Sequence, residues 1–118
     1  MIEKHLIERA IVFYRSSSGV EPVRDWLQSL PRDDRRTIGA DLATMQQVGW
    51  PVGMPLCRSM DDGLWEVRSD LPSRCVAGLL FFAHEGDIAV VHGFIKKTRK
   101  TPPGDIELAR KRVQEMKA

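Results

Sequence analysis

A chain of 118 residues is long enough for one domain with its own hydrophobic core and too short for two. Hydrophobic residues make up 42% of it and charged residues 29%, which is typical of soluble globular proteins and excludes a disordered or fibrous chain. No apolar run approaches the length of a membrane span, and the start of the chain lacks the apolar stretch of a signal peptide. We therefore expect a single cytoplasmic domain over residues 1–118 whose two cysteines, Cys57 and Cys75, stay reduced.

The net charge of +2 is too small to indicate nucleic-acid binding, but the charge is unevenly distributed. Between Lys96 and Arg112 there are seven Lys or Arg residues against two acids, Asp105 and Glu107. Such a basic patch is the usual electrostatic signature of a phosphate-binding surface. A solvated helix face is the commoner fate of such a run, so both interpretations stay open.

The first half of the chain is predicted to form one strand and two helices. Alternating apolar residues indicate a strand over residues 7–14. Pro22 suits the first turn of a helix, because its missing N–H would be unpaired there anyway. A second helix is expected over about 32–48. Residues 49–55, with two glycines and two prolines, must then form a loop. The first helix takes its apolar face from Val23, Trp26, Leu27 and Leu30.

The second half is predicted to form three strands, over residues 64–69, 75–83 and 88–96, and a last helix over about 103–116. The middle strand is almost continuously apolar, as expected of a central strand covered on both faces. The resulting order, β-α-α-β-β-β-α, predicts an α+β fold in which a small, mostly antiparallel sheet carries its helices on one side.

Side chains alternate between the two faces of a strand, so the polar residues of these strands can be assigned to faces. In the strand 64–69, Glu66 and Arg68 are expected on the face opposite the core, so that Arg68 projects from that surface or from a groove in it. A histidine, an aromatic ring and a cation on one face are typical of surfaces that stack RNA bases and hold phosphates. The alternative is that Phe94 is a core residue and His92 a buried histidine with its hydrogen bonds satisfied; for Phe94 by itself this alternative is favoured. The strand 88–96 is expected to present on one face Ile88, Val90, His92, Phe94 and Lys96.

RNA cleavage without a metal requires three kinds of group. A base takes the proton of the 2′-hydroxyl, cations stabilise the phosphorane, and an acid protonates the departing 5′-oxygen. Lysine acts as a base when nearby cations or burial lower its pKa, and Arg99 and Lys100 beside Lys96 and Lys97 provide such cations. Arginine offers a planar fork of donors to a phosphate. The candidate catalytic residues are Arg68, Arg74, Lys96 and Lys97, with His92 as a possible proton donor. Candidate RNA contacts are Arg58, His92, Phe94, Arg99 and Lys100.

Other chemistries find less support in the sequence. The three histidines do not fall at zinc-ligand spacings with either cysteine, so neither a metal site nor a cofactor is expected. No glycine-rich phosphate loop is present. A Cys/His nucleophilic pair stays open, although Cys75 begins an apolar strand and is expected to be a small core residue.

Three segments of the second half stand out: Gly63 to Arg68, Leu79 to Phe82, and His92 to Pro102 with its Lys-Lys-Thr motif. With the helix segment Ile106 to Arg110, they resemble the phage-derived, HigB-like branch of the RelE/ParE toxin superfamily. The resemblance covers most of the chain and has the same order of elements. It implies a type II toxin–antitoxin toxin, a metal-independent mRNA interferase that cuts mRNA in the ribosomal A site and so arrests translation.

The resemblance also implies partners and site residues. The partners are the ribosome with its mRNA and a small helix-turn-helix antitoxin of the HigA type. The active toxin is then expected to be a monomer and its antitoxin complex a higher-order assembly. Arg68 matches the arginine that ends the family's Leu-Trp-Glu strand, and Arg74 lies where some members have an arginine. Lys96 and Lys97 match the paired lysines, and Phe94 matches the aromatic residue before them.

Gly78 departs from the family pattern, because many members carry an arginine directly before the apolar pair at this point. If that arginine clamps the scissile phosphate, this chain has lost it or has replaced it with Arg74 or Arg58. Two alternatives therefore stay open. One is a ParE-like inhibitor of DNA gyrase, which shares the fold, and the other is a catalytically inactive relative that binds RNA or protein. The paired lysines favour cleavage.

Overall fold

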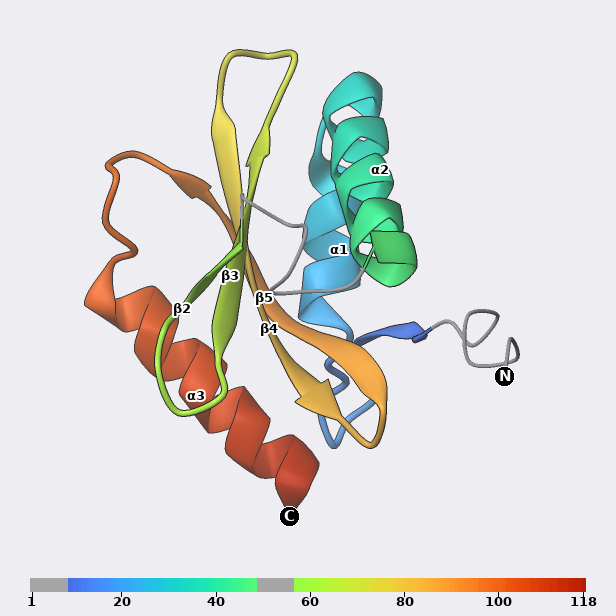
Figure 1. The fold of residues 1–118 in the computed structure, drawn as a ribbon, viewed down its shortest axis with the longest axis vertical. Helices are drawn as coiled ribbons and strands as arrows, with labels where there is room; N and C mark the ends of the chain where they lie inside the picture. Colours follow the sequence, from blue (N-terminus) through green and yellow to red (C-terminus); the bar gives the residue numbers. More distant parts are fainter. Residues whose placement is uncertain (1–8, 49–56) are drawn as a thin grey trace.

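The computed structural model of the protein describes residues 9–48 and 57–118, which form an α+β fold as predicted (Figure 1). Within the described residues the first strand is shorter than expected, since residues 9, 10 and 14 are not part of it. Residues 7–8 of that predicted strand and the loop predicted over residues 49–55 lie outside the described residues. In the described part of the chain, no helix has the length and apolar composition needed to cross a membrane. The elements are β1 (Ile11–Phe13), α1 (Pro22–Ser29), α2 (Arg32–Val48), β2 (Cys57–Ser59), β3 (Trp65–Asp70), β4 (Val76–His84), β5 (Asp87–Lys96) and α3 (Pro103–Lys117).

The strands form one sheet in the order β1-β5-β4-β3-β2. The sheet is mostly antiparallel, as predicted, and only β1 runs parallel to its neighbour β5. The sequence did not predict β2, because its three residues show no apolar alternation. A tight turn pairs it with β3: Asp61, Asp62 and Gly63 have φ angles of 73°, 55° and 83° in the left-handed region.

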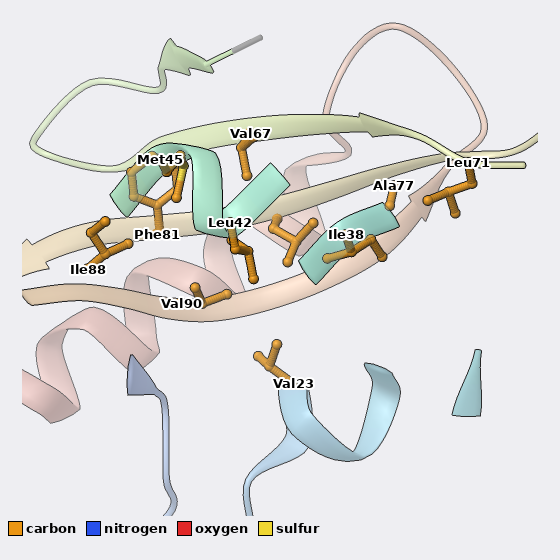
Figure 2. Close-up of a cluster of buried hydrophobic side chains, with 11 residues drawn as sticks. Val23, Ile38, Leu42, Met45, Val67, Leu71, Ala77, Phe81, Ile88 and Val90 are labelled. Carbon is orange, nitrogen blue, oxygen red and sulfur yellow. The ribbon is translucent and has the colours of Figure 1, made fainter. Parts of the chain in front are cut away.

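Helices cover both faces of the sheet, so the prediction that they lie on one side is wrong (Figure 1). Side chains from both faces of β4 are buried, and such a strand needs a layer on each side. The first core lies between the sheet and the helices α1 and α2 (Figure 2) and comprises Val23, Ile38, Leu42, Met45, Val67, Leu71, Ala77, Leu79, Phe81, Ile88 and Val90. The second core lies against α3 and comprises Tyr14, Leu64, Leu80, Phe82, Ala89, Val91, Phe94, Ala109 and Val113.

A β-bulge in β5 changes the faces expected for that strand. Opposite β4, the register passes from Val90 to His92, so Val91 is the inserted residue. An inserted residue interrupts the alternation of side chains along the strand. The prediction that five residues of the strand 88–96 share one face is therefore wrong. The five residues divide at the bulge: Ile88 and Val90 lie in the first core, and His92, Phe94 and Lys96 lie on the face of α3.

Candidate nucleic-acid interface

Two adjoining hollows of about 520 and 290 Å³ form a basic cleft where the ends of β2, β3 and β5 meet. Both hollows are lined by Arg68, Lys96 and Arg99, so they are continuous. Five cationic side chains in this lining face only two carboxylates, which gives the cleft a net positive charge. The residues of the basic cleft are Cys57, Arg58, Glu66, Arg68, Asp70, Val76, Lys96, Lys97, Thr98 and Arg99.

Strand register explains why side chains from distant segments meet here. Residues directly opposite one another in paired strands lie in rows on the same face of the sheet. The first row is Asp70, Val76 and Lys96, the second is Arg68, Gly78 and Phe94, and the third is Arg58, Glu66, Leu80 and His92. Lys96 reaches from the first row past the second, which includes Gly78, to Glu66 in the third.

Glu66 is the centre of a buried polar network. Its side chain is 3% exposed and accepts hydrogen bonds from Lys96 Nζ at 3.1 and 3.2 Å and from Thr101 Oγ1 at 2.5 Å. Arg58 Nε lies 3.3 Å from Glu66 Oε1. A buried carboxylate needs such partners, since an isolated charge is costly away from water. The alternation placed Glu66 on the face opposite the core but did not indicate its burial, and its place in the Leu-Trp-Glu motif was the one sequence signal of its importance.

The two paired lysines have different environments. The Lys96 side chain is 6% exposed, and its ammonium group lies against Glu66 and 3.4 Å from Thr101 Oγ1. The sequence predicted cationic neighbours for Lys96, but the group that binds its ammonium is a carboxylate. Lys97 is exposed and lines the basic cleft. Only Lys97 therefore presents its amine to an incoming ligand.

The predicted arginines divide between the basic cleft and its surroundings. Arg68 is half-exposed and pairs with Asp70 at 3.3 Å, and the exposed Arg99 lines the same cleft. Arg74 lies in the turn between β3 and β4 at a φ of 70°, and the lining of the cleft does not include it. Lys100 lines a neighbouring shallow hollow together with Arg58.

His92 and Phe94 are packed between β5 and α3. His92 Nε2 lies 2.6 Å from Asp105 Oδ1 of α3, and the His92 ring stacks on Phe94 with centroids 5.6 Å apart. Phe94 is 9% exposed, and Lys96 Nζ lies 5.7 Å from its ring centroid. These positions correspond to the core alternative stated for Phe94, and base stacking on either ring stays a prediction.

Gly78 is required by this packing. A Cβ atom at position 78 would lie 2.8 Å from Phe94 Cζ and 3.2 Å from Glu66 Oε2. The first distance is shorter than atoms in proteins tolerate, so any side chain there must displace the Phe94 ring. An arginine at this position is incompatible with the observed positions of Phe94 and Glu66.

The basic run from Lys96 to Arg112 is not one patch. Arg110 donates hydrogen bonds to the Met60 and Asp61 carbonyls at 2.6 and 3.3 Å, and Arg112 donates to the Val91 carbonyl at 2.9 Å. These two arginines tie α3 to the sheet. Of the cations in this run, Lys96, Lys97 and Arg99 at the end of β5 line the basic cleft.

The cysteines differ from the core role expected of Cys75. Cys75 is exposed, because β4 begins only at Val76, so the prediction of a core residue is wrong. Cys57 is half-buried, and burial raises its pKa to about 11. In the described residues, no contact joins either thiol to a histidine. No three His, Cys, Asp or Glu side chains of that part of the chain are grouped as a metal site.

The family model for Phage derived protein Gp49-like (DUF891) matches residues 25–114, which include the basic cleft and the three motif segments. The chain belongs to this family. Gp49-like proteins are members of the RelE/ParE-like toxin group, so the predicted resemblance is confirmed at that level. No curated protein matches the chain.

Proposed function

We propose that this Gp49-like protein is the HigB-like toxin of a type II toxin–antitoxin pair and cuts mRNA in the ribosomal A site without a metal. The basic cleft supports this proposal, because it gathers Arg58, Arg68, Lys97 and Arg99 around one groove at the strand end that carries the Lys-Lys-Thr motif. Clustered arginines and lysines suit the phosphates of a single-stranded RNA.

The proposed reaction exchanges one ester bond of the phosphate for another. The 2′-oxygen bonds to phosphorus while its proton passes to a base, and the bond to the 5′-oxygen breaks as that oxygen takes a proton. Lys97 is the base in this proposal, because the Lys96 ammonium is held by Glu66, whereas Lys97 shares its hollow with the cations Arg68 and Arg99, the setting that favours a neutral lysine. Arg68 and Arg99 stabilise the charge on the phosphorane. Arg74 acts as a clamp only if the RNA extends to the turn between β3 and β4.

The proposed partners follow from the same assignment. A helix-turn-helix antitoxin of the HigA type would block the toxin, and the ribosome would present the mRNA to a monomeric toxin in the cytoplasm. An inactive RNA-binding relative is the second candidate. One observation favours it: Lys96, one of the family's paired lysines, is bound to Glu66 and almost fully buried.

Primer extension on ribosomes that carry a defined mRNA tests the proposal. We expect cuts at A-site codons with the wild-type protein and none with Lys97→Ala. Lys111→Ala, on the exposed surface of α3, is the matched control and should cut normally. Lys96→Ala/Lys97→Ala should also be inactive, and thermal melting shows whether it is still folded. Intact mRNA with a folded wild-type protein would move the assignment to RNA binding, or to gyrase inhibition if expression induces a DNA-damage response.

A further inference from the structure

Arg58 is one of two cations of the basic cleft that contact the buried Glu66 carboxylate, and it is the one that stays exposed. Its Nε lies 3.3 Å from Glu66 Oε1, and its Nη2 lies 3.2 Å from Thr101 Oγ1 and 3.5 Å from the Arg99 carbonyl oxygen. These contacts use one edge of the guanidinium. Within the described residues no contact uses Nη1, and the side chain is 52% exposed. The other edge is therefore open to a ligand.

We infer that Glu66 is a positioning residue that acts through Arg58, so that Arg58, and not Lys96, binds a substrate phosphate. This inference rests on the proposed function, because it takes the phosphate of a single-stranded RNA as the ligand. Glu66 then contributes to binding by orienting Arg58, although it is buried and does not itself contact the phosphate.

Charge balance supports this assignment. Glu66 carries one negative charge and contacts two cations, Lys96 and Arg58, so the three groups together keep one positive charge. Lys96 is 6% exposed and compensates the buried carboxylate, whereas Arg58 lies at the rim with half its surface in solvent. The surplus charge of the network therefore resides on Arg58.

Preorganisation explains why the arrangement would assist binding. An arginine on a free surface loses side-chain entropy when it engages a phosphate, and this loss weakens the contact. Arg58 is already held by Glu66, Thr101 and the Arg99 carbonyl, so less freedom remains to be lost. Its planar fork then meets a phosphate in a fixed orientation.

Gly78 bears on which strand supplies the phosphate-binding cation. The Phe94 ring and the Glu66 carboxylate lie over Gly78, and a Cβ there would lie 3.2 Å from Glu66 Oε2. A cationic side chain therefore does not rise from the middle of β4, and the cation comes from Arg58 on the edge strand β2 instead. Arg74, in the turn, does not line this part of the cleft.

The double variant Glu66→Gln/Lys96→Met tests the inference. It removes one charge of each sign, so the net charge is unchanged and no lone charge stays buried. With a short fluorescein-labelled single-stranded RNA, we expect melting close to wild type but affinity about tenfold lower. Because one phosphate contact is lost, the plot of the logarithm of the RNA-binding constant against the logarithm of the salt concentration should become less steep, by about 0.7. Adding Arg58→Ala to this variant should cause no further loss. Arg36→Ala, an exposed arginine on α2, is the control and should bind normally.

The outcomes separate this inference from the proposed function. Suppose that Glu66→Gln/Lys96→Met melts and binds RNA like the wild type, while Arg58→Ala alone weakens binding. This result overturns only the positioning role of Glu66. Arg58→Ala with unchanged affinity overturns the assignment of the phosphate to Arg58. A wild-type protein that binds RNA but leaves ribosomal mRNA intact overturns the proposed function alone, and one that binds no RNA overturns both.

Discussion

The two faces of the sheet are built from the same strands but differ in chemistry (Figure 1). The face against α1 and α2 buries an apolar cluster that includes Phe81 and Ile88 (Figure 2). The face against α3 is apolar around Phe82 and Val91 and becomes polar where Glu66, Lys96 and Arg58 meet the basic cleft. Stability and ligand binding are therefore expected to respond to different substitutions, and each of the following changes tests that separation.

Phe81→Ala should have the largest effect on stability. Phe81 is fully buried in the first core, and loss of such a side chain costs about 3–5 kcal/mol because a cavity remains. Urea unfolding measures the change, and the molecules that stay folded should bind RNA with normal affinity. A decrease in the free energy of unfolding of less than about 1 kcal/mol would show that the first core does not dominate stability.

Gly78→Ala tests the face against α3. Its Cβ would lie 2.8 Å from Phe94 Cζ, so we expect a loss of about 1–3 kcal/mol through overpacking. Gly39→Ala on α2 is the control, because a Cβ there meets nothing within 4 Å. Because alanine favours a helix more than glycine does, the free energy of unfolding of the control should rise by up to about 1 kcal/mol. Equal effects in urea unfolding would contradict the tight packing at Gly78.

Lys97→Ala/Arg99→Ala should change binding and leave stability almost unaltered. Both side chains are exposed, so the free energy of unfolding should change by less than about 0.5 kcal/mol per substitution. Loss of two phosphate contacts should reduce the salt slope of single-stranded RNA binding by about 1.4. Lys111→Ala removes a lysine outside the basic cleft and serves as the control. An unchanged slope in the double variant would place the phosphate elsewhere.

The smallest effect concerns the cysteines. Burial raises the pKa of Cys57 to about 11, from an ordinary value of 9.0. As the pH rises through this window, the unfolded thiol ionises first, so the contribution of Cys57 to stability is complete below about pH 9 and is lost toward pH 11. Cys57→Ser should remove this slope in pH-dependent unfolding. At pH 8, iodoacetamide should modify the exposed Cys75 before Cys57.

Local signals in the sequence were enough for most of the fold. The proline at the start of α1 and the apolar period of α2 mark the first two helices, and the apolar run of β4 marks the centre of the sheet. The same apolar run indicated that both faces of the sheet are covered, although the predicted fold placed the helices on one side only. The short strand β2 was missed because pairing across a turn, and not its own residues, makes it a strand.

By itself, the sequence determined the α+β fold, the family and the concentration of cations at the end of β5, because these depend on local pattern and composition. Only the tertiary structure decided which of those cations are available. The bulge at Val91 and the space over Gly78 bring Lys96 to Glu66, which is 30 positions away in the chain. A buried ion pair between residues so far apart leaves no periodic signal, since it depends on strand register and on the absence of one side chain.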